Sequence, residues 1–180
     1  ADHNLHVLNY SVPVDRTVSR DELAAHVHTL PEHPGWIPYR TSYYKREWGF
    51  CLPHEVWEAL PEGDYHARID ATLEPGALSL SEVVLPGRSE REILFSTHIC
   101  HPSMCNDNLS GIVVQALLFE WLRGRDLHYT YRGVFVPGTI GALSWLSLQG
   151  TAGTAAVAAG LVLAGLGDEG GFTFKRTRNG

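Results

Sequence analysis

Two kinds of hydrophobic pattern divide the chain. Up to about Leu85, apolar residues come in short alternating runs, such as W-G-F-C-L and Y-H-A-R-I-D-A-T-L, which turn residues separate. After Pro86 and Gly87, longer apolar runs alternate with segments of helical character. A period of two indicates strands with one exposed face, whereas alternating strands and helices are typical of a mostly parallel α/β sheet.

The first part of the chain predicts a strand over Leu5–Val12, which ends at prolines. Ser19 then precedes a short helix, and Glu22 is placed to complete a capping box. A proline-containing loop over residues 31–40 leads to several short antiparallel strands between Tyr39 and Leu85. These strands predict a small β-rich insertion.

The second part predicts a sheet with helices between its strands. The strands are expected at 93–97, 131–136 and 160–166, and the helices at about 109–123 and 140–148. His98 follows the first strand and Asp168 follows the last, at the strand ends where such sheets bind ligands. The predicted organisation is an α/β core made of residues 1–33 and 86–180, with residues 34–85 as the inserted subdomain.

The composition is that of an ordinary globular domain. The 180 residues are 44% hydrophobic and 19% charged, which suits one core and argues against disorder. The net charge is -6 with histidines neutral, and the basic residues cluster only near the end, at Lys175, Arg176 and Arg178. Nucleic acid is therefore not an expected partner, whereas a homo-oligomer is left open.

Neither the cysteines nor the apolar segments indicate secretion or a membrane. Cys51, Cys100 and Cys105 form no C-x-x-C pair, and their odd count fits a reducing compartment, so we predict a cytoplasmic location. The N-terminus shows no charged leader before an apolar run. Residues 144–167 lack charge, but Gln149 and five glycines make them too weakly apolar for a membrane span.

The chemistry-bearing residues concentrate in S-T-H-I-C-H-P-S-M-C-N-D-N-L-S-G, from Ser96 to Gly111. This string puts His98, His101 and Asp107 in one loop between a strand end and a helix start. Zinc prefers imidazole nitrogen and carboxylate oxygen, and a catalytic zinc keeps a position open for water. The residue types therefore indicate a hydrolytic metal site.

Each of these residues also has a purely structural interpretation. Asp107, Asn108 and Ser110 suit a helix N-terminus, where short polar side chains accept backbone N–H bonds. His98 can equally be a half-buried loop histidine bonded to a carbonyl. The two cysteines of the string can ligate a structural zinc, although a small buried cysteine is commoner.

The string resembles the metal-binding segment of the zinc-dependent aminopeptidase superfamily. There, a histidine after a strand precedes an N-D-N-x-S-G string that opens a helix; the histidine binds one zinc ion and the aspartate bridges two. The resemblance implies that His98 and Asp107 are metal ligands. It also implies one or two zinc ions and a zinc-exopeptidase-like three-layer α/β fold with a mostly parallel sheet.

A closer resemblance is to bacterial proteins with an aminopeptidase-like domain, which occur among polysaccharide and natural-product biosynthesis genes. It spans residues 5–180 and is carried by I-P-Y-R-T-S-Y-Y, W-G-F-C-L, H-I-C-H-P, N-D-N-L-S-G and G-D-E-G-G-F-T-F-K-R-T-R. This resemblance implies a small peptide or amide substrate, within a biosynthetic pathway.

The chain departs from the superfamily at two places. An aspartate that orients the first histidine is replaced by Cys100, so that role must come from elsewhere. A pair of glutamates, one of them the general base, is replaced by Gly138 and Thr139. Another group must then supply the base, and His101 and Glu169 are the candidates.

The glycine-containing loop after the second strand has two interpretations. Residues 138–141 can present backbone N–H groups to a substrate carboxylate or an oxyanion. They can equally form a simple turn that leads into a packed helix.

The resemblance assigns the remaining ligands to the C-terminal part. Asp168 occupies the place of the next carboxylate ligand, although it also suits a turn, and Glu169 is an alternative ligand or base. The last ligand of the superfamily is a histidine, which would lie beyond residue 180. Lys175 and Arg176 are candidates for binding an anionic substrate group, with solvated surface charge as the alternative.

Aromatic residues gather in the predicted β-rich insertion. They can wall a substrate pocket, or they can form the core of that small element. The residues are Trp36, Tyr39, Tyr43, Tyr44, Trp48 and Phe50.

Together these features predict a zinc-dependent, aminopeptidase-like hydrolase of a peptide or amide bond, in which zinc polarises the carbonyl and activates water. The alternative is a catalytically altered domain that keeps the peptidase fold and binds a metal or another ligand. The retained His98 and Asp107 favour the first interpretation, and the missing glutamate pair favours the second.

Overall fold

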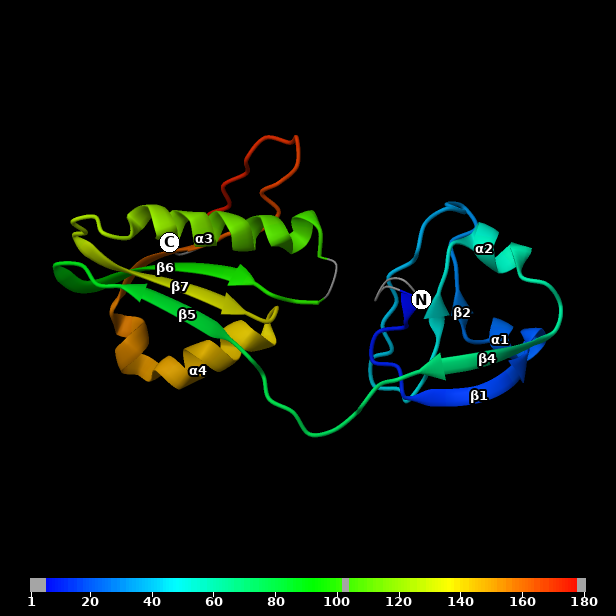
Figure 1. Cartoon of the computed structure of the whole chain (residues 1–180). Helices are drawn as coiled ribbons and strands as arrows, with labels where there is room; N and C mark the ends of the chain where they lie inside the picture. Colours follow the sequence, from blue (N-terminus) through cyan, green and yellow to red (C-terminus); the bar gives the residue numbers. More distant parts are fainter. Residues whose placement is uncertain (1–5, 102–103, 178–180) are drawn as a thin grey trace. The chain divides into compact units, whose positions relative to one another are not determined.

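The computed structural model describes residues 6–101 and 104–177, which form two compact units (Figure 1). The first unit extends to Gly76 and the second begins at Ala77. The first contains β1 (Val14–Ser19), α1 (Arg20–Ala24), β2 (Val27–His28), β3 (Phe50–Cys51), α2 (His54–Ala59) and β4 (Asp64–Ile69). The second contains β5 (Ser81–Leu85), β6 (Ser89–His98), η2 (Asn106–Ser110), α3 (Gly111–Leu122), β7 (Tyr129–Val136), α4 (Ile140–Ala155) and β8 (Val157–Val162).

The first unit is built on two short strand pairs. β1 pairs antiparallel with β4, and β2 pairs parallel with β3. Alternate residues of the longer pair point inward, so that Val18 and Ala67 are buried while their neighbours are exposed. The core of this unit is small and consists of Val18, Leu23, Trp48, Ala67 and Ile69.

Two sequence predictions for this unit need correction. Residues 5–12 do not form the expected strand: Val7 and Asn9 make only isolated bridges, and the first strand starts after Pro13, while Leu5 lies outside the described residues. The predicted run of strands between residues 39 and 85 is interrupted by α2, which begins directly after Pro53. Proline is well suited to a helix start, a signal that the alternating pattern obscured.

Ser19 caps the first helix as predicted, but the Glu22 side chain pairs with Arg16 rather than completing a capping box. The Ser19 hydroxyl accepts a hydrogen bond from the Glu22 backbone N–H at 3.2 Å, and α1 begins at Arg20. The Glu22 carboxylate pairs with Arg16 at 2.8 Å. The cap therefore joins α1 to β1 at their junction.

Ser19→Ala is expected to lower the free energy of unfolding by about 1 kcal/mol, because a helix N–H loses its side-chain acceptor. Urea unfolding followed by circular dichroism measures the change. The matched control is Ser79→Ala, which alters an exposed serine outside helices and strands. Equal losses in the two variants would contradict the capping role.

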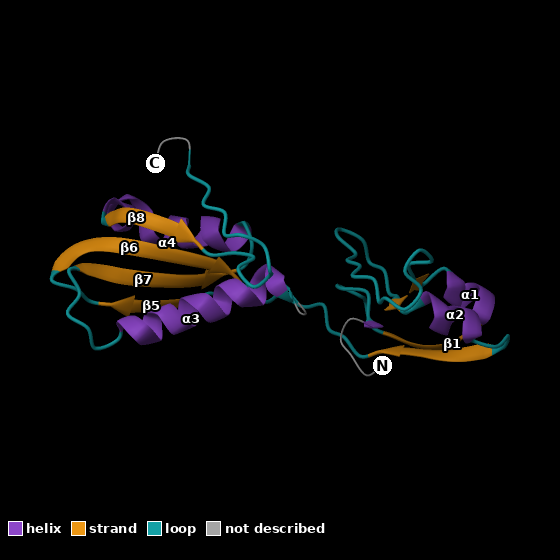
Figure 2. Ribbon diagram, turned by 90° about the horizontal axis from the view of Figure 1, so that it is seen from above, coloured by secondary structure: helices purple, strands orange, loops and turns teal. Residues whose placement is uncertain are grey.

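The second unit is a four-stranded sheet with a helix on each face. The strand order is β5-β7-β6-β8, where β6 is parallel to both β7 and β8 and β5 is antiparallel to β7 (Figure 2). α3 lies along one face and α4 along the other (Figure 1). The predicted α/β class with a mostly parallel sheet is confirmed for this unit.

Neighbouring residues of β7 pack against α3 and α4 alternately. Gly133 faces α3, where an added Cβ would come within 2.8 Å of the Phe119 ring, and Phe119 packs edge-on against Phe95 of β6. Val134 lies on the opposite face and packs with Trp145 of α4. Because successive side chains of a strand point to opposite faces of the sheet, β7 packs against both helices.

A charge network ties three strands together beneath α4. The Arg132 guanidinium donates to Glu92 through two nitrogens, each at 2.6 Å, and to Glu82 at 2.5 Å. The indole of Trp145 also donates to Glu82, at 3.1 Å. The hydrogen bonds to Glu92 hold the pKa of Arg132 above its already high value. The bidentate bond to Glu92 and the bond to Glu82 together fix the positions of β5, β6 and β7 relative to one another.

The predicted elements of this half occur in the predicted order. β6, α3, β7, α4 and β8 correspond to the expected strand, helix, strand, helix and strand, with shifted ends. α4 continues to Ala155 through a break at Gly150, whose φ is +63°. The uncharged segment 144–167 is thus divided between a helix and a strand. No helix within residues 6–101 and 104–177 is both long and apolar enough to cross a membrane.

The strand pairing groups the chain differently from the sequence prediction. Residues 14–19 pair with residues 64–69 inside the first unit, whereas the prediction placed 1–33 with 86–180. Residues 81–85 pair with β7 in the second unit rather than belonging to the insertion. Strands that pair across such long sequence separations leave no local signal of their pairing. Pro86 and Gly87 therefore mark a turn within the second unit rather than a boundary between units.

Candidate functional site

His98 and Asp107 lie together at the carboxyl end of β6. His98 is the last residue of the strand, and Asp107 lies in the turn that precedes α3. The His98 Nε2 atom is 2.8 Å from the Asp107 Oδ1 atom. The His98 side chain is 28% exposed and the Asp107 side chain 77%, so the pair is open to solvent on the carboxylate side.

Asn108 is the buried anchor of this turn. Its side chain is fully buried, and its amide donates to the Thr97 hydroxyl at 2.7 Å, with the carbonyls of His98 and Leu163 at 3.2 and 3.3 Å. Its carbonyl oxygen accepts from the Gly165 N–H at 3.2 Å. One side chain therefore joins the end of β6 to the segment that follows β8.

Asn106 and Ser110 extend this connection along the same segment. The Asn106 side chain accepts from the Gly167 N–H at 2.7 Å and donates to the Asp168 carboxylate at 2.9 Å. The Ser110 hydroxyl accepts from the Leu166 N–H at 2.8 Å. The polar side chains at 106, 108 and 110 thus hold residues 163–168, which we name the C-terminal loop.

These contacts overturn the helix-capping interpretation of the string. α3 begins at Gly111 and has no side-chain cap, because Asn108 and Ser110 bond to the C-terminal loop. Asp107 pairs with His98 instead of capping. Gly111 must be small, since an added Cβ would meet the Asn108 side chain and the Leu163 carbonyl at 2.4 Å.

Sequence reasoning missed the anchoring role of Asn106, Asn108 and Ser110. The signal available was the recurrence of short polar residues at positions 106, 108 and 110. The backbone is non-helical at Asp107 and Asn108, where φ is -105° and -143°. A helix cap and an anchoring turn use the same short polar residues, so the string alone does not distinguish them.

The other predicted site residues do not join His98 and Asp107 in one cluster. Asp168 is exposed and bonds to Asn106 and to the Gly170 N–H at 2.7 Å, while Glu169 is exposed on the same loop. His101 follows β6 and is half-buried. Across the described ranges 6–101 and 104–177, no three His, Cys, Asp or Glu side chains form a group able to hold a metal ion.

The predicted anion-binding residues lie on the exposed C-terminal segment. Lys175 and Arg176 follow the C-terminal loop, in a stretch without helix or strand. Arg178 lies outside the described residues. Their assignment to a substrate group remains a prediction.

The two positions that depart from the superfamily pattern are neighbours. A Cβ on Gly138 would lie 3.4 Å from the Cys100 sulfur. The N–H groups of Ile140 and Gly141 already donate to the carbonyls of Gly138 and Pro137, at 2.7 and 3.0 Å. These two N–H groups therefore support the simple turn into α4 rather than an oxyanion site.

The paired donors suit a zinc ion in type and nearly in spacing. An imidazole nitrogen and a carboxylate oxygen are both common zinc ligands. Two ligand atoms of a tetrahedral zinc lie about 3.3 Å apart, so the observed 2.8 Å contact would have to open by only about 0.5 Å. Since catalytic zinc usually takes three protein ligands, this pair fits as part of a site.

Comparison with known proteins gives a family match, a sequence match and a structure match. The family model described as Domain of unknown function (DUF4910) matches residues 3–180. A Clostridium acetobutylicum protein is 44% identical over 179 residues, and its name is that of a proposed polysaccharide biosynthesis protein with an aminopeptidase-like domain. The match covers 99% of this chain and 41% of that protein.

A solved structure agrees with the sequence match. The crystal structure of a proposed peptidase from Clostridium acetobutylicum superposes with a TM-score of 0.87 at 44% identity. The superposition covers 94% of this chain and 40% of that chain. The chain therefore spans about two fifths of the length of the proteins it matches.

Proposed function

The chain belongs to the DUF4910 family, and from this premise we propose that it carries part of the site of a zinc-dependent, aminopeptidase-like hydrolase. The bond cleaved is a peptide or amide bond in a small substrate, in keeping with the aminopeptidase-like name of the sequence match and the peptidase name of the structure match. The polysaccharide biosynthesis name of one relative supports a place in a biosynthetic pathway.

One observation carries the proposal: the 2.8 Å contact between His98 Nε2 and Asp107 Oδ1 at the carboxyl end of β6. Parallel sheets bind ligands at this edge. The contact joins the two residues to which the resemblance assigns the role of ligands. They are nine positions apart in the sequence and lie in different elements. It leaves the carboxylate open to solvent, as an accessible ligand requires.

Contacts within the chain hold the proposed metal-binding atoms of His98 and Asp107 in place without a metal ion. His98 presents Nε2 toward Asp107, so metal binding requires the imidazole proton to reside on Nδ1. Asn108 fixes the His98 carbonyl and therefore the end of β6. A bound zinc ion would supply a Lewis acid that polarises the scissile carbonyl and lowers the pKa of water.

The remaining roles are proposed for residues near this edge. Asp168 is the third ligand, and it must leave its bond with Asn106 to reach a shared metal ion. His101 and Glu169 are the candidate general bases, since imidazole and carboxylate side chains are the groups that most often take this role in enzymes. Lys175 and Arg176 are the proposed partners of an anionic substrate group.

The second candidate function is a domain that keeps the peptidase fold and binds metal or another ligand without hydrolysis. The specific observation in its favour is that Cys100 and Gly138, which stand in place of two carboxylates of the superfamily pattern, are close enough that a Cβ on Gly138 would lie 3.4 Å from the Cys100 sulfur. Such a site can bind an ion while lacking the usual base.

Metal analysis and amide hydrolysis by the full gene product separate the two functions. We expect at least one zinc ion per chain by plasma mass spectrometry, and hydrolysis of an aminoacyl 4-nitroanilide. Treatment with 1,10-phenanthroline should abolish hydrolysis, and added Zn²⁺ should restore it. Bound zinc with no hydrolysis of amide substrates would favour the second function, and protein that binds no metal would exclude the zinc-dependent hydrolase.

A further inference from the structure

The first unit contains a pocket that is independent of the His98–Asp107 pair. Its volume is about 470 Å³, and it is lined chiefly by Tyr10, Tyr43, Tyr44, Lys45, Arg46 and Leu73. The aromatic residues expected as pocket walls thus divide in the structure: Trp48 is buried in the core, while Tyr43 and Tyr44 stand 63% and 105% exposed. A cavity of this size suits a small ligand.

Backbone hydrogen bonds brace the two loops that carry the tyrosines. Asn9 donates its N–H to the Arg40 carbonyl at 2.9 Å, and its own carbonyl accepts from the Ser42 N–H at 3.0 Å. The buried Ser42 hydroxyl donates to the Lys45 carbonyl at 3.0 Å. The pocket is therefore preformed, which lowers the entropy cost of binding.

Two of the tyrosines have a backbone conformation that side chains rarely adopt. Tyr10 has φ of 65° and Tyr44 has φ of 63°. For residues other than glycine such conformations persist where the surroundings enforce them, and they concentrate at functional sites. Here they accompany large aromatic side chains that remain exposed instead of entering the core.

The charges around the pocket are positive. Lys45 and Arg46 line it, and no aspartate or glutamate does among the residues that the structure describes. The Lys45 ammonium group forms an ion pair with the Glu47 carboxylate at 3.5 Å. Arg46 has no ion-pair partner within the described part of the chain. Arg46 can therefore offer its planar guanidinium to a carboxylate.

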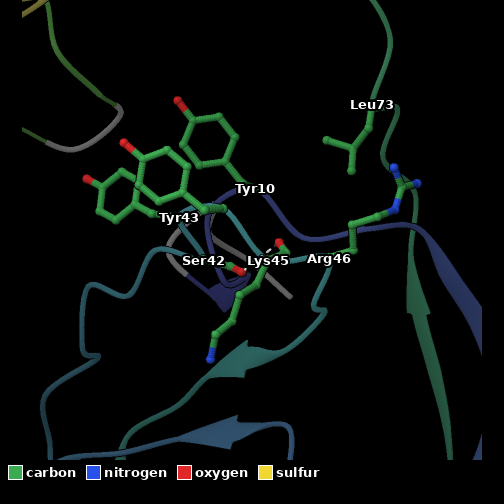
Figure 3. Close-up of a pocket in the computed structure, with 7 residues that line it drawn as sticks. Tyr10, Ser42, Tyr43, Lys45, Arg46 and Leu73 are labelled. Carbon is green, nitrogen blue, oxygen red and sulfur yellow. Dashed lines mark hydrogen bonds between the residues drawn. The ribbon is translucent and has the colours of Figure 1, made fainter.

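The arrangement of the side chains indicates how a ligand would lie. Figure 3 shows the tyrosine rings on one side of the pocket and Arg46 and Leu73 on the other, with the Lys45 side chain directed away. The hydroxyls of Tyr10 and Tyr43 point to the side away from Arg46. A ligand between these walls meets tyrosine rings on one side and the Leu73 side chain and the Arg46 guanidinium on the other.

We propose that this pocket binds an acidic sugar, a pyranose ring that carries a carboxylate. The apolar C–H face of a pyranose packs on tyrosine rings, and its carboxylate pairs with Arg46. The rings are inclined, with centroids 6.3 Å apart and planes at 47° for Tyr10 and Tyr43. Rings inclined in this way cannot hold a flat aromatic base between two parallel faces, which makes a nucleotide the less suitable occupant.

The test is titration calorimetry of the full-length protein with D-glucuronate, D-glucose and uridine monophosphate. D-glucuronate should bind, and D-glucose should bind about tenfold more weakly because it lacks the carboxylate. Arg46→Gln should weaken D-glucuronate about tenfold and leave D-glucose unchanged. Tyr43→Ala should weaken both sugars. Trp36→Ala is the matched control, since Trp36 is equally exposed at 62% and lies outside the lining.

Several results would overturn the proposal. They are no heat of binding with D-glucuronate at millimolar concentration, tighter binding of uridine monophosphate, or an equal loss in Trp36→Ala and Tyr43→Ala. Unchanged melting temperatures would show that the exposed substitutions leave the fold intact. Zinc content and amide hydrolysis do not enter these readouts, so failure here leaves the proposed hydrolase function untouched.

Discussion

Replacing His98 with alanine is expected to lower zinc affinity and amide hydrolysis by more than about a hundredfold. Mutating a residue that only orients a metal ligand already lowers metal affinity or activity by about ten- to a hundredfold, and loss of a ligand itself should cost more. Asp107→Asn should have a similar effect, since it keeps the shape of the side chain and removes its charge. Both variants should fold, because the pair is partly exposed and such pairs contribute at most about 1 kcal/mol. Plasma mass spectrometry and a nitroanilide assay measure the two effects.

The chain offers a matched control for this experiment. His66 and Asp15 form another histidine–aspartate pair, 2.6 Å apart and exposed, on the β4–β1 ladder of the first unit. His66→Ala removes the same chemical groups away from the β6 edge and should leave zinc content unchanged. Equal zinc loss in His66→Ala and His98→Ala, or full zinc retention in His98→Ala, would contradict the assignment of His98 as a ligand.

The sheet of the second unit was predictable because its strands and helices are long and alternate regularly. The run that ends at His98 became β6, and the run after Gly111 became α3. Both are long or strongly apolar runs that stand out from the polar segments around them. The exact ends were less predictable, as β8 shows by starting at Val157 instead of residue 160.

The first unit was harder to predict because its elements are short. β2 and β3 are two residues each, so no periodicity can be read from them. Their pairing depends on backbone bonds between distant residues, such as Phe50 N–H to the His26 carbonyl at 2.8 Å. A local capping signal succeeded at Ser19 in the same unit because cap chemistry involves only residues close in sequence.

The proximity of His98 and Asp107 was predictable, but the contacts that support this pair were not. His98 and Asp107 follow from residue type and from their place between a strand and a helix. The connection from Asn106, Asn108 and Ser110 to the C-terminal loop joins residues more than fifty positions apart. Only the folded sheet, with β8 beside β6, brings those segments together.

That connection leads to the second large expected effect. Asn108→Ala should lower the free energy of unfolding by about 3 kcal/mol, because a buried cavity forms and the Gly165 N–H loses its acceptor. Zinc affinity should fall about ten- to a hundredfold, since the His98 carbonyl and the turn at Asp107 lose their anchor. Thermal unfolding and zinc titration of the full-length protein measure both quantities.

Asn106→Ala is the matched control, because Asn106 belongs to the same string but makes its hydrogen bonds to Asp168 and Gly167 where they are exposed to solvent. Its unfolding free energy should change by less than about 1 kcal/mol, since water can replace exposed hydrogen bonds. Hydrogen exchange of the Gly165 amide should rise in Asn108→Ala and stay near the wild-type rate in Asn106→Ala. If the two variants lost equal stability, or if the Gly165 amide stayed protected in Asn108→Ala, Asn108 would not be the anchor that joins β6 to the C-terminal loop.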